Sequence, residues 1–169
     1  EQGTNFGGAI LNGAGAVVGT FNTDFIGPTM DQGAASVIDS SGRIIVAGVQ
    51  TNHLDGDAQH IVLSHYSASG VLDTTFGTNG VAVVTFGTRV ENFQSLALDS
   101  NGNILVAGLD ANNSIKVTRY FGGSAPTAGT VDMSFGTAGT LAVGVIPADF
   151  QSAVRVAAAH RRFGLRALE

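Results

Sequence analysis

The sequence lacks cysteine and tryptophan, and it is poor in proline, with three residues, and in charge, with 12% Asp, Glu, Lys and Arg. The absence of cysteine excludes a disulfide framework, a thiolate zinc site and a cysteine nucleophile. The absence of tryptophan excludes a Trp-rich platform for sugars. A P-loop, a Rossmann fingerprint and a His-Glu-x-x-His zinc motif are missing as well. Several large classes of enzyme are therefore excluded before any fold is considered.

Segments that direct a chain to a membrane or through it are also missing. No apolar run approaches the roughly 18 residues that indicate a spanning helix. No charged segment followed by an apolar stretch marks a signal peptide. The chain begins at Glu1 rather than at methionine, which fits a leader that was either cleaved off or left out of this sequence. We therefore expect no membrane span and no signal peptide within these residues.

Basic residues are scarce, and half of the eight lie near the C-terminus, at Arg155, Arg161, Arg162 and Arg166. Residues 1–154 hold 12 acidic and 4 basic groups, a net charge of −8, against −5 for the whole chain. Such a body repels phosphate, and its few basic residues are not interleaved with aromatics, so we expect no nucleic-acid partner. The acidic excess suits a hard cation such as calcium, or it serves solubility alone.

Glycine, unlike proline, is abundant in this sequence. The chain holds 24 glycines, and 44% of its residues are hydrophobic. Glycine supplies the positive φ angles that tight turns between strands need. A chain of 169 residues is also long enough to bury a core. This composition favours many short strands joined by tight turns.

A repeat of about 60 residues dominates the chain. The segment Asp39-Ser-Ser-Gly-Arg-Ile-Ile-Val-Ala-Gly48 returns as Asp99-Ser-Asn-Gly-Asn-Ile-Leu-Val-Ala-Gly108. Further along, Leu72-Asp-Thr-Thr-Phe-Gly-Thr-Asn-Gly80 returns as Val131-Asp-Met-Ser-Phe-Gly-Thr-Ala-Gly139. Two complete units of the same architecture are therefore expected.

Apolar runs bounded by turn signals predict four strands in each unit. The expected strands lie at 34–39, 43–49, 60–67 and 81–86 in the first complete unit, and at 94–99, 103–109, 114–121 and 140–146 in the second. Asp39 and Asp99 are expected to cap the turn between the first two strands. Phe76 and Phe135 are expected to anchor the core. We predict an all-β fold of antiparallel four-stranded, propeller-like blades.

A single repeat-built β domain is expected over residues 1–156. It contains a partial unit at 1–30, with Asn5-Phe-Gly7 aligned to Phe76-Gly77 and a last strand near 16–21. Complete units at 31–90 and 91–147 follow, and a partial unit at 148–156 repeats a first strand. The tail at 157–169 is alanine-rich, basic and helix-prone. It is either foreign to the repeat, from a vector or a shifted reading frame, or a capping helix.

The order of three submotifs resembles the delta-60 repeat of bacterial surface and secreted proteins. These are Asp-x-x-Gly-x-Ile-x-Val-Ala-Gly, a strand ending in His65-Tyr66 or Arg119-Tyr120, and Gly70-Val-Leu-Asp-Thr-Thr-Phe-Gly-Thr-Asn-Gly80. The resemblance covers about residues 31–156. It implies propeller-like blades and a secreted or cell-surface location in a bacterium. It implies no agreed activity, so no catalytic residue is carried over.

The number of units is small for this architecture, because closed propellers need 4 to 8 blades. Two complete units leave sheet edges open, and open edges invite pairing with another chain. The partial units at the two ends are candidates to form part of a third blade together. We therefore predict a homo-oligomer in which two or three chains close the blade ring.

One segment distinguishes the two units and is therefore the candidate functional site. Between Gly48 and Tyr66 there are 17 residues, six more than between Gly108 and Tyr120. The additional residues fall in a predicted loop, Gln50-Thr-Asn-His-Leu-Asp-Gly-Asp-Ala-Gln-His60.

Asp55 and Asp57, with Asn52, are candidate oxygen ligands for one calcium ion, which takes 6 to 8 such ligands. His53 and His60 are candidates for a general base or a metal ligand. The alternative for all five residues is a solvated hairpin tip with no bound ion.

Two functions follow from these observations. The first is a structural module that binds a ligand or a partner. The second is a calcium-dependent hydrolase of a lactone or an ester, by analogy with propeller lactonases, in which the cation polarises the carbonyl and a histidine or aspartate activates water. His65 alternates with Ile61 and Leu63, and we expect it in the core rather than at either site.

Overall fold

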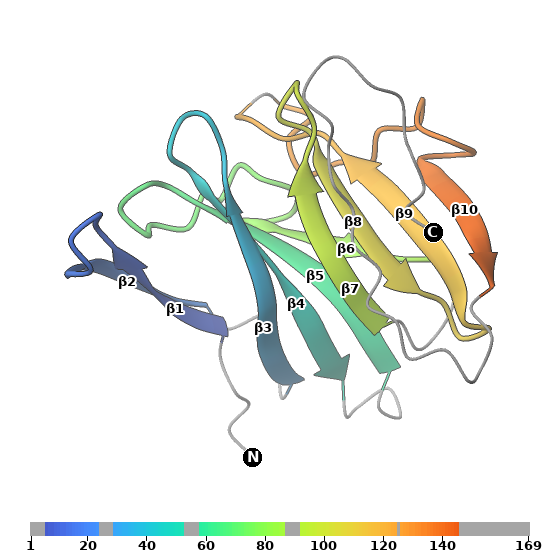
Figure 1. Cartoon of the computed structure of the whole chain (residues 1–169), viewed down its shortest axis with the longest axis horizontal. Helices are drawn as coiled ribbons and strands as arrows, with labels where there is room; N and C mark the ends of the chain where they lie inside the picture. The colour runs from blue at the N-terminus through green and yellow to red at the C-terminus, as the bar shows by residue number, and fades with distance from the viewer. Residues whose placement is uncertain (1–5, 24–28, 53–57, 87–91, 125, 146–169) are drawn as a thin grey trace.

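The computed structural model describes residues 6–23, 29–52, 58–86, 92–124 and 126–145. These residues form ten β-strands and no helix, so the predicted all-β fold is confirmed. The strands belong to three antiparallel sheets, which lie side by side in Figure 1. In the part of the chain described, no helix has the length and hydropathy needed to cross a membrane.

Each complete unit forms one four-stranded sheet in which sequence neighbours pair. The first sheet has the order β3-β4-β5-β6, and the second has the order β7-β8-β9-β10. The strands of the first sheet are β3 (Thr29–Ile38), β4 (Ile44–Asn52), β5 (Ala58–Tyr66) and β6 (Val81–Val84). Those of the second sheet are β7 (Asn92–Leu98), β8 (Ile104–Leu109), β9 (Ser114–Tyr120) and β10 (Thr140–Val145). All eight predicted strands are therefore confirmed, but β3 begins five residues before its predicted start and β4 ends three residues after its predicted end; the other bounds differ by at most two residues.

The third sheet is a hairpin of β1 (Phe6–Leu11) and β2 (Val17–Thr23). The strand expected near 16–21 corresponds to β2. The alignment of Phe6-Gly7 with the Phe-Gly turn is wrong, because Gly7 pairs with Asn22 inside this hairpin and lacks the positive φ of Gly77. Strand pairing of the glycine-rich N-terminal residues was not visible as alternation in the sequence.

The β3–β4 and β7–β8 turns share one hydrogen-bonding pattern. Asp39 Oδ1 accepts hydrogen bonds from the backbone N–H groups of Ser41 and Arg43, at 2.8 and 2.9 Å. Gly42 takes the left-handed conformation, with φ of 79°. Asp99 caps its own turn in the same way, as predicted, at 2.8 and 2.9 Å. The carboxylate thus satisfies the backbone donors that the turn would otherwise leave without partners.

Two apolar cores lie on the two faces of the first sheet. One core fills the space between this sheet and the second sheet, and β7 contacts β3, β4 and β5. Its buried members are Ile45, Ala47, Ile61, Leu63, Phe76, Ala82, Val84, Leu96, Ile104, Val106, Tyr120 and Ala128. The other core fills the space toward the hairpin and contains Ile44, Val46, Val62 and Tyr66, with Ile10, Phe21, Leu72 and Val81 packed against them. The result is a stack in the order hairpin, first sheet, second sheet.

Candidate functional site

The predicted loop at 50–60 is largely a hairpin of paired strands. β4 continues to Asn52 and β5 begins at Ala58, and Gln50 pairs with His60. Asn52 and His60 therefore lie in strands, and their placement in a loop is wrong. The physical reason is that extending the ladder pairs backbone N–H and C=O groups that a loop would leave to solvent. β4 and β5, with nine residues each, are longer than β8 and β9, with six and seven, so most of the six additional residues lengthen the first unit's sheet at this end.

Three of the candidate site residues, His53, Asp55 and Asp57, lie outside the described residues. Within the described ranges, no group of three His, Asp or Glu side chains is placed to hold a metal ion. His60 is partly buried, and its Nδ1 atom is buried without a hydrogen-bond partner. No acid therefore orients this ring through Nδ1, as one does in a catalytic His–Asp pair. Calcium binding at 52–57 stays a prediction.

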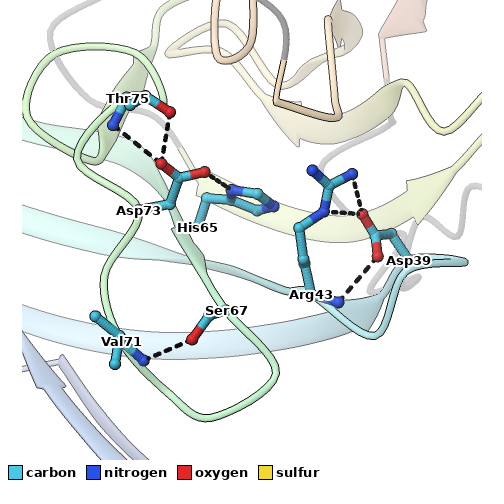
Figure 2. A network of polar contacts seen from close by, with 7 residues as sticks. All are labelled: Asp39, Arg43, His65, Ser67, Val71, Asp73 and Thr75. Atoms are coloured by element: carbon cyan, nitrogen blue, oxygen red, sulfur yellow. Dashed lines mark hydrogen bonds and ion pairs between the residues drawn. The ribbon is translucent and has the colours of Figure 1, made fainter.

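The acid–histidine pair that the structure does contain lies at the other end of β5 (Figure 2). His65 Nδ1 lies 2.9 Å from Asp73 Oδ2, and His65 is 1% exposed. Thr75 donates two hydrogen bonds to Asp73 Oδ1, from its backbone N–H at 3.0 Å and from its hydroxyl at 2.6 Å. The His65 ring also packs at 5.2 Å between centroids against Phe76. The prediction of a core histidine is confirmed.

This pair does not form the base of a Ser-His-Asp triad. Ser64 is the neighbouring serine, and its hydroxyl is buried without a hydrogen-bond partner. Successive strand residues point to opposite faces of a sheet, so Ser64 and His65 are on opposite sides of β5. His65 Nε2, which would have to accept the nucleophile's proton, is itself buried with no partner. The pair therefore acts as a structural link between β5 and the turn that follows.

The second unit builds the same link with an arginine in place of the histidine. Arg119 occupies the position of His65 and contacts Asp132 Oδ2 through Nη2 at 2.6 Å and Nε at 2.8 Å. Its guanidinium lies 4.8 Å from the centre of the Phe135 ring. Arg119 Nη1 also reaches Asp99 Oδ2 at 3.9 Å. One arginine thus contacts both Asp99 and Asp132.

The first unit divides this task between two side chains. Arg43 contacts Asp39 Oδ2 through Nη2 at 2.7 Å, while His65 contacts Asp73. In the second unit the position of Arg43 is held by Asn103, which donates to Asp99 Oδ2 at 2.9 Å. The pairs Arg43/His65 and Asn103/Arg119 are therefore two alternative ways of supplying hydrogen-bond partners to two turn aspartates.

We predict that the residues of one unit can replace those of the other only when both positions of the pair are changed together. Arg119→His should destabilise the protein, because it removes the two guanidinium contacts to Asp132 Oδ2 and the positive charge beside Asp99. Adding Asn103→Arg should restore part of the loss, since it recreates the arrangement of the first unit. Urea unfolding of the two single variants and the double variant should give a favourable coupling of about 0.5 to 3 kcal/mol. Additive effects of the two changes would contradict the exchange.

Three of the turn aspartates, Asp39, Asp73 and Asp132, have pKa values below their ordinary range. For Asp73 and Asp132 the largest cause is the hydrogen bond from the hydroxyl of Thr75 or Ser134, which lowers the pKa. For Asp39, partial burial raises the pKa, but the hydrogen bonds from Arg43 and Ser41 outweigh it. These carboxylates are consequently ionised at neutral pH, and each is engaged by its own turn.

An open groove of about 830 Å³ runs along β6. Its lining includes Leu72, Val81, Tyr120 and Val131, and the Tyr120 hydroxyl donates to the Val83 carbonyl at 3.1 Å. No acidic, basic or histidine side chain is among its described lining residues. General acid–base chemistry needs such a group within hydrogen-bond reach of the substrate. The groove therefore offers apolar contact rather than a catalytic constellation.

Two further capped turns escaped the sequence analysis. Asn12 Oδ1 accepts from the N–H groups of Ala14 and Ala16, each at 3.0 Å. Asp110 caps the turn between β8 and β9 in the same manner, with Asn113 in the left-handed conformation at φ of 57°. The spacing of Asn12 and Gly15 equals that of Asp39 and Gly42, which was the available signal.

A scan against protein-family models, a search of curated proteins and a search of solved structures each give no match. The class of the protein therefore follows from its own architecture. It is an all-β protein in which a repeated four-stranded antiparallel sheet is stacked on its neighbour and tied by aspartate-capped turns.

Proposed function

We propose that this chain is a repeat-built β module that binds partners through the faces of its sheets rather than converting a substrate. In this proposal the sheets are propeller-like blades of the delta-60 kind, from a bacterial protein that is secreted or displayed at the cell surface. The observation that carries the proposal is that the residues repeated in both units form turns and packed cores. The repeated aspartates are engaged in turns, and the repeated apolar positions pack one sheet on the next.

The proposal includes association between chains. The described strands form two four-stranded sheets and a hairpin, and no sheet among them closes on itself. A propeller made of such units needs 4 to 8 of them. We propose that two or three chains supply the missing units by forming a homo-oligomer. As ligands we propose small molecules held by the sheet faces or by the loops that join the strands.

The competing hydrolase function is tested by turnover of ester and lactone substrates with calcium and with a chelator. We expect no turnover that depends on calcium, because the described residues contain no assembled catalytic set. Asp55→Asn and Asp57→Asn address the predicted ligands directly, with Glu91→Gln as a charge-matched control elsewhere in the chain. Turnover that is lost on chelation and in both aspartate variants, but kept in the control, would establish the hydrolase instead.

A further inference from the structure

The hairpin is equivalent to the last two strands of a complete unit. β2 ends the partial unit as β6 ends the first complete unit, and β1 pairs with β2 as β5 pairs with β6. A tyrosine that ends the third strand of the following unit also reaches each of these last strands. The Tyr66 hydroxyl lies 2.7 Å from Thr23 Oγ1 at the end of β2, and the Tyr120 hydroxyl donates to the Val83 carbonyl of β6 at 3.1 Å. A complete unit has two more strands before this pair, and no described strand fills those places beside the hairpin.

One face of β3 is left uncovered as a result. In the second sheet the equivalent strand, β7, is covered by β3, β4 and β5, and Leu96 on the covered face is 9% exposed. For β3, the contact of β5 is supplied by β1 (Figure 1), and no described strand supplies the contacts of β3 and β4. Ser36, the equivalent of Leu96, is accordingly exposed. Ile38 is 66% exposed, whereas its equivalent Leu98 is partly buried against the core.

An open groove lies at this uncovered place. It has a volume of about 380 Å³ and runs between β1 and β3. One wall is formed by the consecutive residues 7–11 of β1, so side chains from both faces of that strand meet at the groove along its backbone. Ile38, Ile44 and Val46 of the first sheet also line the groove. Among the described strands β1 pairs with β2 alone, so the other edge of β1 has backbone N–H and C=O groups without ladder partners.

The chemistry of the groove suits an extended, uncharged polypeptide. Its described lining holds no Asp, Glu, Lys, Arg or His side chain. β1 itself contains no charged residue and no proline, which are the usual devices that protect an edge strand from pairing. The bulge of the hairpin adds Val18 to β2, so the ladder of β1 stays regular. A strand added to β1 would gain backbone hydrogen bonds and cover Ile38 at once, just as β4 pairs with β5 and contacts β7.

From this geometry we infer that β1 accepts an antiparallel strand from a partner protein, and that the added strand lies in the groove over β3. The inference rests on the proposed function and names its mode of recognition, β-strand addition, in which backbone pairing supplies affinity and side-chain pockets supply specificity. The added strand takes the place that β4 holds beside β5. There Val49 pairs with Ile61, which is buried in the core between the two sheets. The partner strand is therefore uncharged, with a β-branched residue at the position that faces β3.

A synthetic peptide with the sequence of residues 43–52, which spans β4, is the probe for this site. We expect one labelled peptide to bind each full chain saturably, measured by fluorescence anisotropy. Replacing both Val49 and Gln50 of the peptide by proline should abolish binding. Successive N–H groups of a strand point to opposite edges, so one of the two prolines must remove a donor directed at β1. Bound peptide should also slow hydrogen exchange of the backbone amides in Phe6–Leu11.

A charge in the groove tests the same site from the side of the protein. Ile38→Lys should weaken peptide binding at least about tenfold, because the added strand would bury the ammonium group without a partner. Met133→Lys is the matched control, since Met133 is 65% exposed and is not among the residues that line the groove. Circular dichroism confirms that both variants are folded. Equal binding to the unmodified chain and Ile38→Lys, or equal binding of the parent and proline peptides, would overturn the inference.

The remaining outcomes separate this inference from the proposed function. Absence of saturable peptide binding, or slowed exchange confined to residues outside β1, would overturn the added strand and leave the binding module in place. Light scattering shows whether a second copy fills the groove instead. Self-association of the unmodified chain that is lost in Ile38→Lys but kept in Met133→Lys would assign the groove to a second copy and overturn the partner strand. Calcium-dependent turnover of an ester or lactone would overturn the proposed function, whatever the peptide does.

Discussion

Phe76→Ala is expected to lower the free energy of unfolding by about 3 to 5 kcal/mol, the usual cost of removing a large buried aromatic side chain. Phe76 is 0% exposed and lies in the core between the two sheets. Its ring also packs against His65, which the link to Asp73 holds in place. The truncation would leave a cavity that the two rigid sheets cannot close.

Phe135→Ala is the matched control because Phe135 occupies the same position in the second unit. Phe135 is only partly buried, and the residue it contacts is the guanidinium of Arg119. Its loss should therefore cost less, about 1 to 2 kcal/mol. Urea unfolding of both variants measures the difference. Equal losses would show that the two units bury this ring equally in solution and would contradict the stack described above.

Gly77→Ala is expected to be the second strongly destabilising change. Gly77 adopts φ of 55°, and a Cβ atom there would overlap the backbone carbonyl of Val81. That carbonyl accepts the hydrogen bond from the Thr78 N–H at 2.8 Å, so it cannot move without loss of the turn. We expect a loss of about 3 kcal/mol or more, since the steric overlap adds to the left-handed conformation of a non-glycine residue.

Gly15→Ala separates the two contributions. Gly15 adopts φ of 81°, but no atom lies within 4 Å of an added Cβ. Only the conformational cost remains, and we expect a loss of about 1 kcal/mol. Thermal or urea unfolding of both variants provides the comparison. A loss at Gly77 no larger than the loss at Gly15 would mean that the Phe-Gly turn is free to rearrange, contrary to its packing against the 128–129 segment.

The strands and the principal turns were predictable because their signals are local. A run such as Ile44–Gly48, preceded by Asp39 and Gly42, contains both the apolar pattern of a strand and the residue types that its turn requires. The repetition of this pattern from Asp99 onward doubled the signal. The assignment of His65 to the core also followed from local alternation with Ile61 and Leu63.

The structure of the candidate site between Gln50 and His60 could not be predicted from local sequence signals. Polar residues between Gln50 and His60 read as a loop, yet the ladder extends through Asn52 and resumes at Ala58. Polar side chains are compatible with the end of a hairpin, because the ladder is made by hydrogen bonds between backbone N–H and C=O groups, which every non-proline residue has. The strand at Phe6–Leu11 was not predicted, because its glycines interrupt the alternation of apolar and polar side chains that indicates a strand.

The sequence by itself determined the repeat, the antiparallel order of strands within each unit and the identity of the turn caps, because these depend on residues close together in the chain. Only the tertiary structure decided which face of each sheet is covered. Leu141 and Ala82 occupy the same place in the repeat, yet one is exposed and the other is buried. Whether a strand residue is buried depends on what packs against its face of the sheet. That neighbouring layer is set by the stacking of whole units rather than by the local sequence pattern.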